Sequence, residues 1–270
     1  MINTFANDLA EIRRRNPLVH NITNYVVMNF TANALLAIGA SPIMAHSVEE
    51  VEEIVGLSSA LVINIGTLSP PWVTAMALAA AAAEKKRIPI VLDPVGAGAT
   101  RYRTETAGKL ALEHRISVIR GNASEILALA GGTSATKGVD SVNTVEDART
   151  AAMEMAGRLS CVVAVTGAVD FVTDGKRSVA IANGSPMMRR ITGTGCAASA
   201  ITGAFCAVQP DPLAAAAGAL VAFGIAGEIA AEGNPGVGTY AAMLLNRLGD
   251  LEPEMVTKRA RIIESGFRKL

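Results

Sequence analysis

The chain has 270 residues, half of them hydrophobic, and its 24 lysine and arginine residues balance 24 aspartate and glutamate residues. This balance excludes a protein that attracts nucleic acid or an anionic membrane through its overall charge, so any phosphate binding must be local. The three cysteines stand in apolar surroundings and are too few for a disulfide framework or a metal cluster, which favours a reducing, cytoplasmic compartment.

Short β-rich runs that end in Gly, Asn or Asp alternate with longer helical patterns, which is typical of βα units around a parallel sheet. The expected strands are residues 42–45, 61–65, 88–92, 117–119 and 161–165. The expected helices are residues 24–38, 48–57, 71–86, 104–114, 124–130 and 145–159. Because no linker separates two halves, we expect one α/β domain over residues 1–270.

The last third of the chain begins with a hairpin pattern and continues as helices. Residues 169–173 and 178–182 flank Asp174 and Gly175, a strong two-strand turn pattern that we place at one edge of the sheet. From Cys196 onward the pattern is almost wholly helical. The uncharged run between Asp211 and Glu228 is shorter than the roughly 20 apolar residues of a membrane span, so it predicts a buried helix.

Polar residues follow several of the expected strands, where ligands collect in open α/β sheets. Asp93 closes an apolar strand and either coordinates Mg²⁺ or caps the turn that follows. Glu125 stands three residues after Asn122, which fits a capping box, whereas Arg120 has no capping role there and suits phosphate oxygens. As residues after sequential strands, Asp93 and Glu125 could hold one hydrated metal between them.

Three further positions have ordinary explanations beside functional ones. Thr166 and Gly167 could hold a phosphate or a ribose, but a Thr-Gly turn is common. Asn24 precedes the first expected helix, where capping is its most economical role. Met44 ends a short strand, where a methionine is more often a core residue than part of a ligand pocket. The three histidines show no zinc-ligand spacing.

The most informative stretch is residues 191–196, which read Ile-Thr-Gly-Thr-Gly-Cys and run into a small-residue segment. Gly193, Thr194 and Gly195 would let backbone N–H groups approach an anion at a helix start, where the helix dipole adds positive charge. Cys196 follows at once, and we expect the helix N-terminus to lower its pKa and make it a candidate base. The alternative is a small core cysteine after an ordinary glycine-rich helix start.

Together these motifs resemble the hydroxyethylthiazole kinases of the ribokinase-like superfamily, over nearly the whole chain. The most discriminating position is Cys196, because most ribokinase-like enzymes have an aspartate there. The resemblance implies a three-layer α/β sandwich with a mostly parallel central sheet flanked by helices, a β-hairpin and a helical C-terminal third. It also implies an ATP- and Mg²⁺-dependent kinase that phosphorylates the primary hydroxyl of hydroxyethylthiazole in thiamine salvage.

On the acceptor side, the resemblance implies that Met44 and Gly193 line the thiazole pocket, with Asn24 as a less direct contact. Cys196 would lie beside the substrate hydroxyl and accept its proton late in the transfer. The family resemblance further implies a homotrimer whose thiazole sites lie between neighbouring subunits, and small molecules as the partners of the protein.

On the donor side, the resemblance implies that Arg120 and Thr166 bind ATP, and that Asp93 and Glu125 hold Mg²⁺ through water. Phosphoryl transfer passes through a loose transition state, so the protein has to align the hydroxyl and neutralise spreading charge. The amides of residues 193–195, Mg²⁺ and Arg120 would share the second task.

Other interpretations remain open at this point. An ATP-dependent dehydratase of hydrated nicotinamide nucleotides would share the anion hole, but it would have an aspartate where Cys196 stands. A kinase of another small alcohol, such as the pyrimidine precursor of thiamine or a sugar, would differ only in the shape of its pocket. A nucleotide-sensing trimer that binds ATP without transfer is the non-enzymatic alternative.

Overall fold

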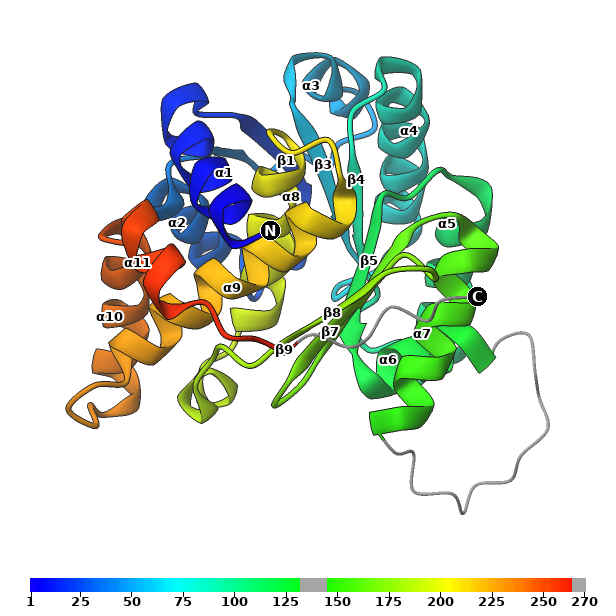
Figure 1. Ribbon diagram of the computed structural model, residues 1–270. Coiled ribbons are helices and arrows are strands. Elements are labelled where there is room, and N and C mark those ends of the chain that lie inside the picture. Colours follow the sequence, from blue (N-terminus) through cyan, green and yellow to red (C-terminus); the bar gives the residue numbers. More distant parts are fainter. Residues whose placement is uncertain (132–144, 264–270) are drawn as a thin grey trace.

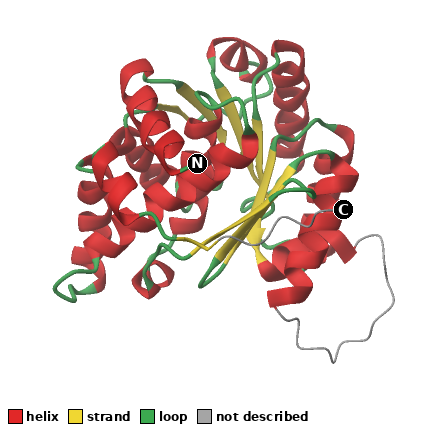
Figure 2. Cartoon of the chain, in the orientation of Figure 1, coloured by secondary structure: helices red, strands yellow, loops and turns green. Residues whose placement is uncertain are grey.

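A nine-stranded sheet runs through the computed structural model, which describes residues 1–131 and 145–263 (Figures 1 and 2). The strands lie in the order β2-β1-β3-β4-β5-β6-β7-β8-β9. Their bounds are β1 Leu18–Ile22, β2 Ser41–Ile43, β3 Ala60–Asn64, β4 Ile90–Asp93, β5 Val118–Asn122, β6 Val162–Thr166, β7 Asp170–Thr173, β8 Ser178–Ile181 and β9 Ile262–Ile263.

The sheet is parallel from β2 to β6 and antiparallel from β6 to β9. The predicted hairpin is confirmed as β7 and β8, and its turn contains Gly175 at φ +87°, a backbone conformation that favours glycine. The hairpin does not form the sheet edge, because β9 pairs with β8 beyond it. The mostly parallel sheet therefore agrees with the sequence prediction, whereas its last strand, β9, was not predicted.

Helices cover both faces of the sheet, as Figure 1 shows. One face packs against α1 Ile2–Arg15, α2 Met28–Ile38, α8 Thr194–Cys206, α9 Pro212–Ala230, α10 Val237–Gly249 and α11 Pro253–Arg259. The other packs against α3 Val51–Leu57, α4 Pro70–Lys86, α5 Arg101–Glu113, α6 Ala123–Gly131 and α7 Val145–Leu159. Alternate strand residues enter the two cores: Val62 faces the first, while Leu61 and Ile63 face the second. The three-layer prediction is confirmed.

Small residues let α8 lie close against the sheet. A Cβ atom at Gly203 would stand 2.7 Å from Val62 Cγ2 on β3, so a larger residue would push the helix away. Helix α9 packs on α8. It is long and apolar enough to cross a membrane, but 94% of its apolar window is buried inside the protein, as predicted for a core helix. The close packing of α8 brings its N-terminus to the carboxyl ends of the parallel strands.

The N-terminal region differs most from the sequence prediction. Strand β1 was not expected, because the polar residues His20 and Asn21 interrupt its apolar pattern, yet both are buried. His20 Nε2 lies 2.8 Å from the carbonyl oxygen of Ala45, which satisfies one ring nitrogen inside the core. Helix α2 begins at Met28, so Asn24 lies in the loop after β1 and does not cap it; the N-cap is Val27, without a side-chain cap.

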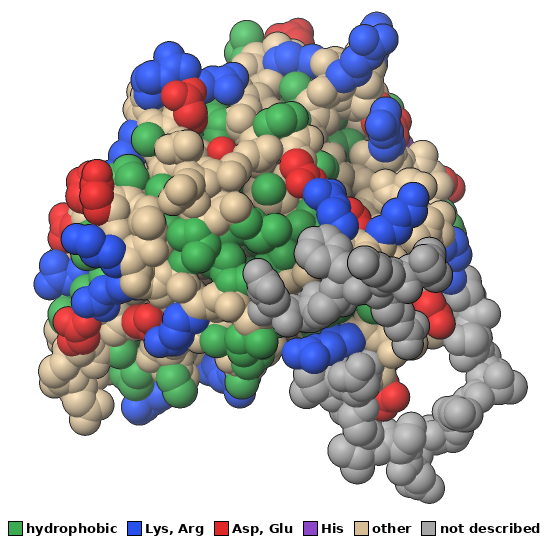
Figure 3. All heavy atoms as spheres, in the orientation of Figure 1, with side chains coloured by type: hydrophobic (Ala, Val, Ile, Leu, Met, Phe, Trp, Pro, Cys, Tyr) green, Lys and Arg blue, Asp and Glu red, His purple; other side chains and the backbone are tan. Residues whose placement is uncertain are grey.

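The surface agrees with the zero formal net charge. On the face drawn in Figure 3, basic and acidic side chains alternate around the margin, and hydrophobic side chains gather near the centre, over the region of α9. The described residues on this face therefore form no extended region of one charge sign.

Candidate active site

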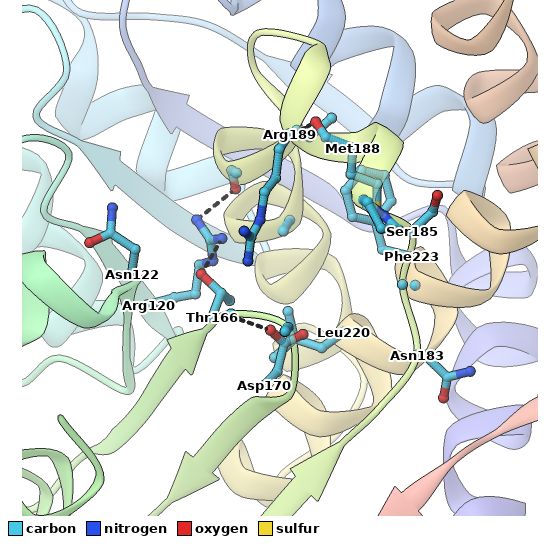
Figure 4. A pocket seen from close by; sticks show the side chains of 18 residues that line it. Arg120, Asn122, Thr166, Asp170, Asn183, Ser185, Met188, Arg189, Leu220 and Phe223 are labelled. Carbon is cyan, nitrogen blue, oxygen red and sulfur yellow. Dashed lines mark hydrogen bonds between the residues drawn. The ribbon is translucent and has the colours of Figure 1, made fainter. Parts of the chain in front are cut away.

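Two adjoining cavities lie where the carboxyl ends of β4, β5 and β6 meet the start of α8. The small cavity, of about 170 Å³, is lined by Asp93, Val95, Arg120, Asn122, Glu125, Thr166, Gly193, Gly195 and Cys196. The large cavity, of about 460 Å³, is shown in Figure 4. The two share the wall residues Arg120, Asn122, Thr166 and Gly195. A ligand that occupies both cavities would therefore pass the Arg120 side chain.

Asp93 is fully buried at the end of β4 and presents one oxygen without a partner. Its Oδ2 accepts hydrogen bonds from Asn64 Nδ2 at 2.9 Å and from Ser199 Oγ at 2.8 Å. Its Oδ1 has no hydrogen-bond partner. Burial raises the pKa of Asp93 to about 6, against the opposing effects of the Arg120 charge and the Ser199 hydrogen bond. A buried carboxylate oxygen without a partner is a group that a cation can satisfy.

Glu125 lines the same cavity and also holds two loops. Its Oε1 accepts a hydrogen bond from Gly96 N and its Oε2 one from Asn122 N, both at 2.9 Å. Asn122 Oδ1 in turn accepts from Glu125 N at 2.9 Å, so the predicted capping box is present. The capping and cavity-lining roles are therefore compatible.

The donor set around Asp93 Oδ1 fits Mg²⁺ held partly through water. The described residues contain no group of three or more His, Cys, Asp or Glu side chains that could hold a metal directly. Asp93 and Glu125 supply two carboxylates, and both line the small cavity. Mg²⁺ prefers oxygen ligands and keeps several of its waters, so two carboxylates suffice.

Arg120 is only 8% exposed and is fixed by three neighbours. Its Nη1 donates to the Gly195 carbonyl oxygen at 3.0 Å and its Nη2 to Thr166 Oγ1 at 2.9 Å. Nη1 also lies 4.0 Å from Asp93 Oδ2. Dashed lines mark these two bonds in Figure 4, and the Arg120 side chain that they hold lines both cavities.

The start of α8 has the backbone geometry that the sequence predicts for anion binding. Gly193 is the N-cap with φ +90°, and a Cβ atom there would lie 3.0 Å from Val27 Cγ1, so both conformation and space favour glycine. The first amides of a helix have no acceptor within it. Thr194 Oγ1 donates to the Met188 carbonyl oxygen at 3.0 Å, so its hydroxyl fastens the preceding segment.

The expectation that Cys196 has a lowered pKa is wrong. Burial, together with the smaller effect of the nearby Asp93 charge, raises the pKa of the thiol to about 11. Asn24 Nδ2 donates a hydrogen bond to Sγ at 3.5 Å, but this does not compensate for the lost hydration. Burial and a like charge thus outweigh the helix N-terminus, and the thiol is protonated at neutral pH.

Asn64, the last residue of β3, belongs to this site and was missed in the sequence. Its Oδ1 accepts from Asn24 Nδ2 at 3.0 Å and from Gly66 N at 2.9 Å, while its Nδ2 donates to Asp93. It therefore connects the Cys196 side of the cavity with the Asp93 carboxylate. The signal for it in the sequence is the polar residue that ends the apolar run at 61–64.

The structure brings most of the predicted site residues together. The small cavity is lined by Asp93, Arg120, Glu125, Thr166, Gly193, Gly195 and Cys196, and the large cavity by Thr194. Asn24 contacts Cys196 without lining either cavity. Met44 directly follows β2, on the side of the sheet where the parallel strands have their carboxyl ends. It is partly buried and lines neither cavity.

Comparison with known proteins finds the same similarity in sequence and in structure. The model of the hydroxyethylthiazole kinase family matches residues 9–254. The chain is 51% identical to hydroxyethylthiazole kinase of Desulfotalea psychrophila, over 97% of this chain and 96% of the relative. A hydroxyethylthiazole kinase protein from Pyrococcus horikoshii superposes with a TM-score of 0.91 at 45% identity, over 97% of this chain and 99% of that one.

A more distant likeness concerns the fold alone. Pyridoxal kinase from Staphylococcus aureus, solved in complex with AMP-PCP and pyridoxal, superposes with a TM-score of 0.61 at 18% identity. The superposition covers 78% of this chain and 87% of that one. The two proteins therefore share the fold, with a mostly parallel sheet between layers of helices, as the sequence predicts.

Proposed function

The chain belongs to the hydroxyethylthiazole kinase family, and we propose that it transfers the γ-phosphoryl group of ATP to the primary hydroxyl of 4-methyl-5-(2-hydroxyethyl)thiazole. The product would feed thiamine phosphate synthesis in the cytoplasm. We further propose that residues 1–270 form a single kinase domain.

One observation carries this proposal: buried Asp93, whose Oδ1 has no hydrogen-bond partner, lines the cavity that the start of α8 also lines. A carboxylate oxygen and free backbone amides attract opposite charges, so a metal and a phosphoryl group can be held side by side there. The Arg120 guanidinium lies between the two. This combination supports phosphoryl transfer more directly than it supports nucleotide binding alone.

The residues of the chain divide the work. Asp93 and Glu125 would hold Mg²⁺ through water, and Mg²⁺ when bound would neutralise charge on the phosphate oxygens. The amides of residues 193–195 would receive the transferred phosphoryl group. Arg120 and Thr166, already joined by a hydrogen bond, would hold the nucleotide where the two cavities meet. The large cavity, at about 460 Å³, is of a size that accepts a nucleoside.

Cys196 would lie beside the acceptor hydroxyl, with Asn24 as its neighbour. Because the thiol is protonated at neutral pH, it would orient the hydroxyl and would not act as a thiolate base. A loose transition state needs little help from a base before the bond to phosphorus forms. The proton of the hydroxyl then leaves late, when the new bond to phosphorus has made the alcohol oxygen strongly acidic, and passes to an oxygen of the transferred phosphoryl group.

We also propose a homotrimer with the thiazole sites between neighbouring subunits. Met44 and Asn24 line neither cavity of one chain, which is the arrangement expected when the acceptor pocket is completed by a second subunit. Tyr25 and Val26, next to Asn24, are 63% and 72% exposed. Exposed apolar side chains at the edge of a site are typical of an interface. Met44 and Gly193 would then face the thiazole ring from two subunits.

The decisive experiment follows ADP release from the purified protein with Mg-ATP and hydroxyethylthiazole. We expect release that depends on the thiazole alcohol and is lost in Asp93→Asn. Replacing the acceptor by the pyrimidine alcohol of thiamine, a sugar or a hydrated nicotinamide nucleotide tests the three enzymatic alternatives. If the protein binds ATP but releases no ADP with any of these acceptors, it would be a nucleotide sensor, and the proposed function would be contradicted.

A further inference from the structure

The two cavities are lined by two cationic side chains among the described residues, Arg120 and Arg189. Arg120 is already bound to the Gly195 carbonyl and the Thr166 hydroxyl. The Arg189 side chain makes no hydrogen bond and no ion pair within 4.0 Å to any described residue. Among the described residues that line the large cavity, Arg189 is therefore the guanidinium with all of its donors free for a ligand, whereas Arg120 has only its buried Nε unpartnered beside two engaged nitrogens.

The backbone that carries Arg189 is held in place from both sides. The residue lies in η1 Pro186–Arg190, a short 3₁₀ helix that follows β8. At its start Ser185 Oγ accepts a hydrogen bond from Met187 N at 3.2 Å, and Thr194 Oγ1 donates to the Met188 carbonyl oxygen from the first turn of α8. Figure 4 shows the Arg189 side chain extending from this segment into the cavity, toward Arg120.

Arg189 is exposed to solvent, and its charge also acts on a carboxylate of the large cavity. Asp170 also lines the large cavity, where its Oδ1 accepts a hydrogen bond from Gly167 N at 2.9 Å. Burial raises the pKa of Asp170 to about 6, while the charges of Arg120 and Arg189 act to lower it. Both guanidinium groups thus act on one carboxylate at the floor of the cavity.

The side chains that line the two cavities carry too little positive charge to balance a triphosphate. Three carboxylates, Asp93, Glu125 and Asp170, line the two cavities against two guanidinium groups. The proposed Mg²⁺ would offset the carboxylates nearest to the transferred group. The phosphates that remain with the nucleotide would lie on the large-cavity side, where Arg189 lies and the carboxylate pair does not.

We infer that Arg189 is a second phosphate-binding residue, which contacts the α- or β-phosphate of the donor nucleotide. A guanidinium can bind phosphate oxygens through two parallel hydrogen bonds, and such charge-assisted bonds are among the strong ones in proteins. Arg189 lines only the large cavity, so it holds the part of the nucleotide that leaves as diphosphate, whereas the start of α8 receives the transferred group. The inference rests on the proposed function for the identity of the donor.

The test compares ADP with adenosine in equilibrium binding, measured by calorimetry on the full-length protein. Arg189→Ala is expected to weaken ADP binding on the order of tenfold or more and to leave adenosine binding unchanged, because adenosine has no phosphate. Arg189→Lys should restore part of the ADP affinity. The matched control is Arg190→Ala, since Arg190 is the next residue, is exposed like Arg189, and lines neither cavity. In steady state, Arg189→Ala should raise KM for ATP and leave KM for the acceptor unchanged.

Two outcomes would overturn the inference: ADP affinity equal to that of the wild type, or an equal loss of ADP and adenosine affinity, which would indicate a wall residue. A wild-type protein that does not bind ADP would also overturn it. Failure of the proposed function is separate. If the wild type binds ADP but phosphorylates no thiazole alcohol, a selective loss of ADP affinity in Arg189→Ala still supports the inference.

Discussion

Ser199 Oγ, on α8, donates a hydrogen bond of 2.8 Å to Oδ2 of Asp93 at the end of β4, and so leaves Oδ1 of the same carboxylate as the unpartnered atom. Asn64 binds the same Oδ2 from β3. Two neutral donors on one oxygen fix the orientation of the carboxylate before any ligand arrives. The helix that supplies the amides of the proposed anion hole thus also orients the proposed metal ligand.

Ser199→Ala is expected to move the acid limb of the pH–activity profile to higher pH, by roughly one unit. The Ser199 hydrogen bond stabilises the ionised form of Asp93 and opposes the burial that raises its pKa to about 6. Without that bond the pKa rises further, so more acid-side activity is lost because the metal needs the ionised carboxylate. The profile of kcat/KM for Mg-ATP measures the shift.

The matched control for this prediction is Thr202→Val. Thr202 is buried on the same helix, and its hydroxyl donates to the Ala198 carbonyl rather than to a site residue. We expect its profile to follow that of the wild type. An unchanged acid limb in Ser199→Ala would contradict the assigned role of Ser199.

Asp93→Asn should abolish measurable turnover without lowering thermal stability at pH 7. The folded-state pKa of about 6 lies above the ordinary aspartate pKa of 3.8, so ionisation of Asp93 disfavours the folded state. Protonated Asp93 therefore stabilises the folded state. This stabilisation is fully present below about pH 4 and is lost as the pH rises through 6. Differential scanning calorimetry should therefore give the variant an equal or higher Tm at pH 7 and a smaller difference at pH 4; a Tm well below that of the wild type at pH 7 would refute this.

Cys196→Ser is expected to keep measurable activity, because the thiol is protonated at neutral pH and the transition state is loose. Cys196→Asp should be at least as active as Cys196→Ser, because a carboxylate accepts a proton more readily than a hydroxyl does. Single-turnover rates with saturating Mg-ATP compare the two variants. A folded but inactive Cys196→Asp protein would count against any proton-accepting role at this position.

Glu125→Gln is expected to raise the Mg²⁺ concentration needed for half-maximal activity and to lower the free energy of unfolding by about 1–2 kcal/mol. Both carboxylate oxygens accept backbone N–H groups, and a glutamine NH₂ cannot accept the second bond. Magnesium titration and urea unfolding give the two readouts. Ser124→Ala, in the same first turn of α6 but outside both cavities, serves as the control and should need no additional Mg²⁺.

Subunit mixing tests whether the acceptor site lies between chains. Met44→Arg and Asp93→Asn are each expected to be inactive, but a ring of three that contains both variants has one junction with both native residues. Co-expressed and doubly tagged trimers should recover roughly a third of the wild-type activity. Sedimentation equilibrium checks the mass of the assembly. Mixed trimers that stay inactive would mean that Met44 and Asp93 of one site belong to the same chain.

The layered fold was predictable because the βα alternation is strong in residues 42–182, where strand ends differ from the predicted ones by a few residues. Strand β1 was not, since His20 and Asn21 are satisfied by tertiary contacts that a local pattern does not contain. Strand β9 was hidden for a similar reason: two residues form a strand only because the edge of β8 is available.

The site was predictable at the level of which residues meet, and less so in its electrostatics. Asp93 and Arg120 lie near the carboxyl ends of the parallel strands β4 and β5, Glu125 follows β5 directly, and topology alone brings them together. The raised pKa of Cys196 depends on how much water the surrounding helices exclude, which the sequence of the turn does not specify. Arg189 was also overlooked, because its place beside the cavity depends on the Thr194–Met188 hydrogen bond.

The fixed position of the Arg120 side chain in the wall shared by the two cavities affects the entropy of ligand binding. A long side chain that is free in solution loses rotational freedom whenever it has to grip a ligand. Here the Gly195 and Thr166 contacts immobilise the guanidinium already in the ligand-free chain. That entropy is lost once, when the polypeptide folds, and is not lost again in each catalytic cycle.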